Sequence, residues 1–119
     1  MSSFKDLQVY QKAYKLALRV HQLSMLLPKE IQFDLADQIR RAARSIPTNI
    51  AEGYGKKSSL KDFQRFLNIA LGSKDEMLVH VEFLRDLKYI DPFLFAELSA
   101  SYEEIGKMLF GLIKSLRLT

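Results

Sequence analysis

The sequence predicts an all-α protein whose single domain, residues 1–119, is an antiparallel up-down-up-down four-helix bundle. Four segments, at about 4–27, 30–54, 60–88 and 92–117, place apolar residues three and four positions apart, which is the spacing of an amphipathic helix. No segment shows the alternation that is typical of a strand. The breaks between segments fall at Pro28, at Gly53–Gly55 and at Asp91–Pro92. Because these breaks leave room only for short connections, successive helices are expected to be antiparallel neighbours.

Composition limits the classes of protein to which the chain can belong. Hydrophobic residues make up 48% of the 119 residues, which is enough for the core of one domain. The chain has no cysteine, which excludes disulfides, thiolate metal ligands and cysteine nucleophiles. Its first residues do not resemble a signal peptide, and no apolar run approaches the roughly 20 residues that cross a bilayer. We therefore expect a soluble, cytoplasmic protein with no membrane partner.

The segment 4–27 carries apolar residues on two flanks rather than one. A first seam at helical spacing consists of Val9, Ala13, Leu16, Val20, Leu23 and Leu27. A second seam consists of Leu7, Tyr10, Tyr14, Leu18, His21 and Met25. At about 100° per residue the two seams lie on nearly opposite sides, and a lone bundle can cover only one of them. The second seam therefore predicts a homo-oligomer, with Tyr10, Tyr14 and His21 as candidate subunit-interface residues.

Turn and cap residues indicate where the other helices begin, end or bend. Pro47 lies inside the second segment, where it should kink the helix or loosen one turn. Gly53 is expected to end that helix in the left-handed conformation. Ser59 and Asp91 stand at the N-cap positions of the third and fourth helices. The fourth helix carries one apolar stripe, formed by Leu94, Leu98, Ile105, Met108, Leu109, Leu112 and Leu116.

A polar stripe lies beside the core face of the second segment and consists of Gln38, Arg41, Ser45, Asn49 and Glu52. Such a stripe is compatible with a buried network, a subunit contact or an active site, and Arg41 could pair with Glu52 directly or through the residues between them. A single carboxylate with no histidine nearby is a poor acid–base set. We therefore favour a structural stripe or an interface, and we expect no catalytic residue, no enzyme activity and no cofactor.

Neither histidine is predicted to bind a metal ion. His21 belongs to the second seam of the first segment, so it is expected to pack in the protein or at an interface. His80 lies on the flank of the third segment and is expected at the surface.

Positive charge is concentrated in the first half of the chain. Residues 1–65 hold 12 Lys and Arg against 6 Asp and Glu, and residues 66–119 hold 6 against 8, which leaves a net charge of +4. Outward-facing cations of the second and third segments could contact phosphates. The alternative is a solvated basic face, and no groove-reading motif or aromatic stacking platform is evident. The candidate nucleic-acid-binding residues are Arg40, Arg44, Lys56, Lys57, Lys61 and Arg65.

Several motifs extend over nearly the whole chain. They are Phe4-x-Asp6-Leu7 with Tyr10-Gln11-x-Ala13, Ser45-Ile46-Pro47-x-Asn49-Ile50-Ala51-Glu52-Gly53, and Phe63-x-x-Phe66-Leu67 with Gly72-Ser73-x-x-Glu76. With these motifs the chain resembles the four-helix-bundle family of proteins encoded in intervening sequences of bacterial 23S rRNA genes. The resemblance implies a homopentameric ring. It also points to a relative, the accessory protein of diversity-generating retroelements, which looks like a basic pentameric barrel that binds nucleic acid and a reverse transcriptase.

The family pattern suggests a small or apolar residue at position 74, and Lys74 departs from it. The phasing of the third segment places it near the core stripe. Either its aliphatic stem packs while its amine reaches water, or the helix is phased differently there.

The leading functional expectation is a non-enzymatic homopentameric scaffold that presents a repeated basic surface to RNA or DNA. The alternative is a protein–protein adaptor, for example an accessory subunit of a reverse transcriptase, a polymerase or another nucleic-acid-processing protein. A third hypothesis, an enzyme, would require Arg41, Asn49 and Glu52 to meet in a cleft.

Overall fold

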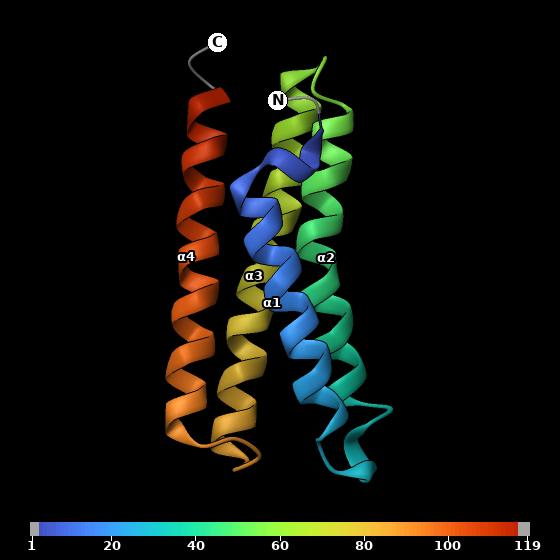
Figure 1. The fold of residues 1–119 in the computed structure, drawn as a ribbon, viewed down its shortest axis with the longest axis vertical. Helices are drawn as coiled ribbons and strands as arrows, with labels where there is room; N and C mark the ends of the chain where they lie inside the picture. The colour runs from blue at the N-terminus through green and yellow to red at the C-terminus, as the bar shows by residue number, and fades with distance from the viewer. Residues whose placement is uncertain (1–2, 117–119) are drawn as a thin grey trace.

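Four long helices form most of the described part of the chain, residues 3–116, in the computed structural model (Figure 1). α1 spans Gln8–Met25, α2 Leu35–Gly55, α3 Leu60–Asp86 and α4 Pro92–Leu116. Two short 3-10 helices, η1 at Phe4–Asp6 and η2 at Lys29–Ile31, precede α1 and α2. Successive long helices run in opposite directions, so residues 3–116 form the expected all-α bundle, 47 × 23 × 20 Å in size, and contain no strand.

The connection between α1 and α2 differs most from the sequence prediction. The expected helix 4–27 is divided, because Leu7 is extended between η1 and α1. The expected start of the second helix at residue 30 is wrong, since α2 begins at Leu35. The side-chain amide of Gln32 donates to the carbonyl oxygens of Ser24 (2.8 Å) and Leu27 (2.9 Å). These bonds satisfy the end of α1 and hold the connection in a turn.

The caps of α3 and α4 are confirmed. The Ser59 hydroxyl accepts a hydrogen bond from the Asp62 amide (3.2 Å), and the Asp91 carboxylate accepts one from the Leu94 amide (2.7 Å). α3 ends at Asp86 rather than at residue 88, and Lys88 has a left-handed conformation with φ of 65°. The predicted last residue of α4, residue 117, lies outside the described residues.

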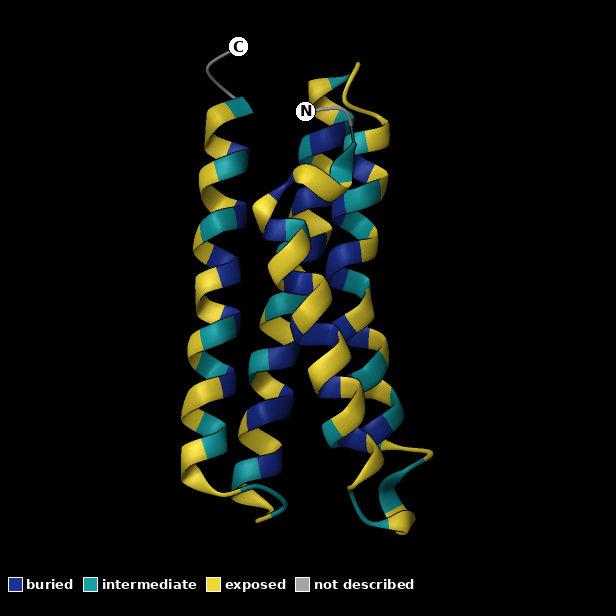
Figure 2. Cartoon of the chain, viewed as in Figure 1, coloured by how far each residue is buried: buried dark blue, intermediate teal, exposed yellow. Residues whose placement is uncertain are grey.

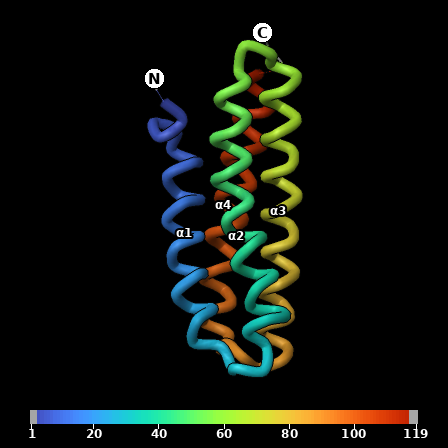
Figure 3. The backbone as a smooth tube through the Cα atoms, turned by 90° about the vertical axis from the view of Figure 1, so that its right-hand side faces the viewer, coloured from blue at the N-terminus to red at the C-terminus, as the bar shows by residue number. Residues whose placement is uncertain are grey.

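The apolar core is centred where α2 and α3 pack together along their length (Figure 2). α1 packs on α2 and α4 packs on α3, and of the neighbouring pairs of long helices α1 and α4 touch least. On that side Lys12 lies 2.9 Å from the Glu104 carboxylate and Arg19 pairs with Glu97, and both pairs are exposed, so they contribute little. The four helices therefore stand near the corners of a square in chain order (Figure 3).

Gly53 does not end α2 in the left-handed conformation, so that prediction is wrong. No glycine among the described residues has a positive φ, and α2 continues through the buried Pro47 as far as Gly55. A Cβ atom at position 53 would lie 2.9 Å from Cβ of Phe66 and 3.3 Å from the carbonyl oxygen of Phe63. Gly53 is therefore needed because α2 approaches α3 closely at this level.

Three polar side chains of α3 and α4 are largely buried. His80 was expected at the surface but is buried, with Nε2 3.0 Å from the Glu76 carboxylate. Tyr102, which the predicted stripe of the fourth helix omitted, is 1% exposed, and its hydroxyl has no hydrogen-bond partner within residues 3–116. Burial raises the pKa of Tyr102 above its ordinary value. The aliphatic stem of Lys74 crosses α4 at Gly106, and its amine lies 2.6 Å from the exposed carboxylate of Asp75. The stem therefore packs on the bundle, as the first of the two predicted arrangements has it.

Candidate functional site

The first seam of α1 is covered and most of the second is bare. Val9, Ala13, Leu16 and Val20 are buried against the other helices. In the second seam Leu7 is buried and Tyr10 is half-buried, but Leu18 and Met25 are 51% and 59% exposed, and Tyr14 and His21 are also exposed. Phe4 packs edge-on against Tyr10 with ring centroids 4.9 Å apart, and Tyr10 stacks on Tyr14 at 5.9 Å.

These exposed residues line a surface groove between α1 and α2, which we call the α1–α2 groove. Its volume is about 470 Å³, and its lining residues include Phe4, Tyr10, Tyr14, Leu18 and His21 on one side. The α2 side of the groove is formed by Arg44, Pro47, Thr48, Ala51 and Glu52. The floor is apolar, with one guanidinium and one carboxylate among its residues. Such a surface suits a partner that presents apolar side chains and at least one charge.

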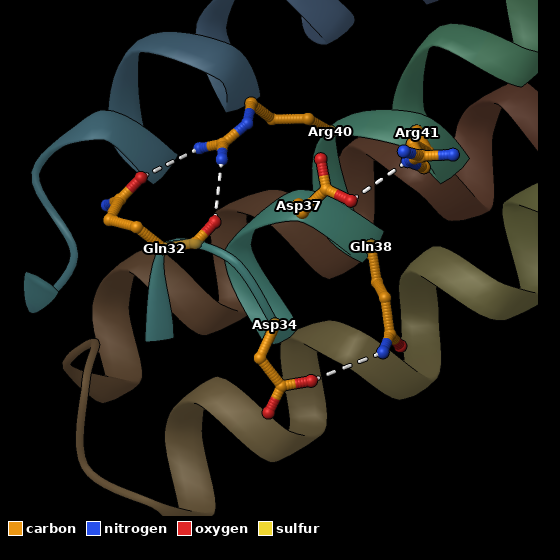
Figure 4. A network of polar contacts seen from close by, with 6 residues as sticks. All are labelled: Gln32, Asp34, Asp37, Gln38, Arg40 and Arg41. Atoms are coloured by element: carbon orange, nitrogen blue, oxygen red, sulfur yellow. Dashed lines mark hydrogen bonds and ion pairs between the residues drawn. The ribbon is translucent and has the colours of Figure 1, made fainter. Parts of the chain in front are cut away.

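The predicted polar stripe is divided among three places. Gln38 and Arg41 bond within the first turns of α2, to Asp34 (3.4 Å) and Asp37 (2.9 Å) respectively (Figure 4). The expected pair between Arg41 and Glu52 is not formed, because Asp37 lies one turn from Arg41 and takes its guanidinium. Glu52 lines the α1–α2 groove instead.

The middle of the stripe joins α2 to α3. The hydroxyls of Ser45 and Ser73 lie 2.7 Å apart, and the Asn49 amide donates to the Ser45 carbonyl oxygen (2.8 Å) and hydroxyl (3.0 Å). All three side chains are half-buried. This part of the stripe is a structural network that helps to fix the register of the two helices.

Arg40 does not point outward, so its prediction as a phosphate ligand is corrected. Its guanidinium donates to the Ser24 hydroxyl (2.9 Å) and to the side-chain (3.1 Å) and main-chain (2.9 Å) oxygens of Gln32 (Figure 4). It also lies 3.7 Å from the sulfur of Met25. Arg40 therefore ties the end of α1 to the turn before α2, and its charge is used inside the protein.

Four of the predicted cations gather at one end of the bundle, around the turn between α2 and α3. Lys56, Lys57, Lys61 and Arg65 are all exposed there. Lys57 lies 3.8 Å from the centroid of the Tyr54 ring, and Arg65 lies 4.5 Å from that of Phe66. Arg65 is also 4.0 Å from Asp62. Arg44 is separate from this group, about 18 Å along α2 from Lys56 at 1.5 Å per residue.

Two further cations reach the same end and were missed from the sequence. Lys5 stands in η1 and Lys114 in the last turn of α4, and both segments lie at the end where α2 meets α3 (Figure 1). The Gln64 amide, near the start of α3, approaches the Ile113 carbonyl oxygen at 3.5 Å, which places α4 beside this turn. We call Lys5, Lys56, Lys57, Lys61, Arg65 and Lys114 the basic end. The only signal in the sequence was the antiparallel topology, which brings both of these segments to one end of the molecule.

No group of three or more His, Asp or Glu among residues 3–116 is arranged to hold a metal ion. None of the helices described is both long and apolar enough to cross a membrane.

The geometry defines a class of protein, an all-α four-helix bundle with an exposed apolar groove on one side and a basic end. Within that class, the chain belongs to the family of 23S rRNA-intervening sequence proteins, whose family model matches residues 5–111. It is similar to the crystal structure of a protein of unknown function from the S23 ribosomal protein family of Bacteroides thetaiotaomicron VPI-5482. The two are 33% identical, the match covers 89% of this chain and 95% of that one, and the TM-score is 0.82. A comparison with curated proteins found no match.

Proposed function

We propose that the protein is a non-enzymatic, cytoplasmic, homo-oligomeric scaffold, with five subunits, that presents its basic ends to RNA or another nucleic acid. The observation that carries this proposal is the basic end, where six exposed cations from four segments of the chain share one end of the bundle. Phosphate contacts of this kind give affinity that is independent of sequence and depends strongly on salt. The bare second seam of α1 supports the oligomer, because an exposed apolar groove is a surface that a partner covers.

Oligomerisation would strengthen weak phosphate contacts. One bundle offers a small set of exposed lysines, each a modest contribution in water. Several bundles held side by side repeat this set, so a single RNA strand would meet many contacts at high effective concentration.

The test is a salt titration of binding to a labelled single-stranded RNA. Each neutralised phosphate contributes about −0.7 to the slope of log affinity against log salt for single strands. A basic-end variant should therefore bind more weakly and with a flatter slope; it carries Lys56→Gln, Lys57→Gln, Lys61→Gln and Arg65→Gln. A control variant loses the same charge from exposed lysines elsewhere, by Lys15→Gln, Lys29→Gln, Lys88→Gln and Lys107→Gln.

The control variant should keep most of the affinity and the slope. Equal losses in both variants would show that only net charge matters, and the basic end would lose its assigned role. Absence of RNA binding by the unmodified chain at low salt would remove the nucleic-acid part of the proposal. A monomer in light scattering at micromolar concentration would remove the oligomer.

A protein–protein adaptor is the second candidate, and the opposite end of the bundle favours it. Three large apolar side chains are almost fully exposed at or beside the connections α1–α2 and α3–α4: Leu26, Phe33 and Phe93. Phe33 is 96% exposed, so it adds nothing to the core. Capture of a partner protein that survives nuclease treatment and is lost in the variant Phe33→Ser, Phe93→Ser would support the adaptor. Capture of nucleic acid alone would count against it.

A further inference from the structure

A second exposed apolar stripe lies on α3 and faces away from the core. Its members, at spacings of three, four, three and four, are Ile69, Gly72, Glu76, Val79 and Phe83. Ile69, Val79 and Phe83 are 42%, 51% and 52% exposed. Acidic residues flank or belong to the stripe, namely Asp75, Glu76, Glu82 and Asp86. We call it the α3 stripe; neither the core of the bundle nor the basic end accounts for it.

The α3 stripe complements the α1–α2 groove in charge. The groove holds Arg44, whose guanidinium is exposed and makes no ion pair with another described residue, together with His21. The α3 stripe carries Glu76 at its middle, with its side chain 52% exposed although its carboxylate also contacts His80 of the same helix. The groove also holds Glu52, two turns along α2 from Arg44. At the level of Arg44 one surface is apolar with a cation and the other is apolar with carboxylates, so there each suits the other better than it suits itself.

The two surfaces also match in height. Val20, Leu23 and Leu27 of α1 line the same partly open pocket as Met77, Val81 and Leu84 of α3, so the two stretches lie at about the same height, 57 or 58 positions apart when paired in order. α1 and α3 run in the same direction (Figure 1). A rotation about an axis parallel to the bundle preserves height. It therefore brings Tyr14 to Gly72, Leu18 to Glu76, His21 to Val79 and Met25 to Phe83 of the next copy.

This register is favourable at each level. Gly72 has no atom within 4 Å of an added Cβ among the described residues, which leaves room for the Tyr14 ring. Glu76 arrives at the level of Leu18, where Arg44 lines the groove. Met25 and Phe83 are both more than half exposed in the single chain and would cover one another.

The two surfaces lie on neighbouring sides of the helix square. The groove faces out between α1 and α2. The α3 stripe is centred about 80° around α3 from Ser73, which bonds Ser45 of α2, so it faces out from the α2–α3 side. Joining one surface to the other then turns successive copies by about 90° for an ideal square, close to the 72° (360°/5) that a ring of five requires. The contact is heterologous and closes into a small ring with α2 nearest the axis.

We propose that the α1–α2 groove of one copy binds the α3 stripe of the next, with Arg44 facing Glu76 across the contact. This inference rests on the proposed oligomer and specifies its interface. It also places every basic end on the same rim of the ring, because all copies share one direction.

The absence of cysteine makes a direct test possible. A double variant, His21→Cys with Val79→Cys, places one thiol on each surface at matched height. A short bismaleimide should convert it into a ladder of covalent multimers whose last band counts the subunits of the ring. The matched control is His21→Cys with Ala100→Cys. Ala100 is exposed on α4. Lys74 of α3 lies over Gly106 of α4 and the two helices are antiparallel, so Val79, five residues after Lys74, lies at about the level of Ala100, six residues before Gly106.

The control should give no ladder, and neither should His21→Cys alone. A dimer band from His21→Cys alone would show that the groove pairs with itself, which overturns the proposal. No ladder from the double variant, with an oligomer in light scattering, would overturn this interface and leave the oligomer standing. A monomer in light scattering would overturn both.

A charge exchange gives an independent readout. Arg44→Glu and Glu76→Arg should each shift the mass in light scattering toward that of the monomer, and the double exchange should restore the mass of the oligomer. Circular dichroism on each variant checks that the exposed substitutions leave the helices folded. Single exchanges that keep the full mass would overturn the pairing of Arg44 with Glu76.

Discussion

Two glycine substitutions should have opposite effects on stability, because a new methyl group meets different neighbours in each. Gly53→Ala would place a Cβ 2.9 Å from Cβ of Phe66 and 3.3 Å from the carbonyl oxygen of Phe63. Both atoms are fixed to the backbone of α3, so α2 and α3 would have to move apart. Gly106→Ala would place a Cβ 2.7 Å from Cε of Lys74 and 3.0 Å from its amine. Those atoms are the far end of a flexible side chain, which can swing toward water.

The magnitude follows from two opposing terms. Alanine is more favourable than glycine inside a helix by about 0.8–1 kcal/mol. Overpacking a rigid contact costs about 1–3 kcal/mol. Gly53→Ala should therefore destabilise the protein by about 1 kcal/mol. Gly106→Ala should instead stabilise the protein by most of the roughly 0.8–1 kcal/mol that alanine contributes to a helix. Gly111→Ala is the reference, because no described atom lies within 4 Å of its added Cβ, so it measures helix preference alone.

Urea unfolding followed by circular dichroism measures these differences, at one protein concentration because a homo-oligomer gains stability with concentration. The order of stability should be Gly111→Ala, Gly106→Ala, unmodified chain, Gly53→Ala. The steric reasoning would be refuted if Gly53→Ala were as stable as Gly111→Ala. A loss of more than about 1 kcal/mol in Gly106→Ala would show that Lys74 cannot move aside.

Five further outcomes test other parts of the structure. Tyr102→Phe should stabilise the protein by about 1 kcal/mol in the same assay, because it removes a buried hydroxyl without a partner among residues 3–116. Burial raises the pKa of Tyr102, so the phenol loses its proton at lower pH in the unfolded state than in the folded state. The free energy of unfolding should therefore fall as the pH rises above about 10, and the fall should be smaller in Tyr102→Phe. Arg40→Leu should cost about 2 kcal/mol by breaking its bonds to the turn before α2, and an unchanged urea midpoint would contradict that role. Ser45→Ala and Ser73→Ala should cost about 1 kcal/mol each but little more when combined, and full additivity would show that the two hydroxyls do not share a bond. Phe33→Ser should change the unfolding free energy by less than about 0.5 kcal/mol, because the ring is 96% exposed.

The bundle was predictable from the sequence because its signals are local. Apolar residues at helical spacing and the capping side chains of Ser59 and Asp91 act within a few residues of their own positions. The start of α2 was not predictable, because the turn before it is held by Gln32 and Arg40, whose partners lie 5 to 16 residues away. The role of Gly53 depends on α3, so its sequence neighbours suggested only a helix end.

The candidate sites show the same division between local and long-range information. The second apolar seam of α1 followed from its own spacing, and Tyr14 and His21 are exposed in the single chain. Their role at a subunit interface stays a prediction. The basic residues were read as one group because they are close in sequence. The fold separates Arg40 and Arg44 from the rest and adds Lys5 and Lys114, since the ends of distant segments meet at one end of the bundle. His80 was misplaced because a residue at the edge of a helical face is covered or bare according to the neighbouring helix.

The crossing of Lys74 over Gly106 couples two distant positions of the chain. The lysine stem lies across α4 where Gly106 has no side chain, and a larger residue at 106 would turn the lysine toward water. The effect of the residue at either position therefore depends on the residue at the other.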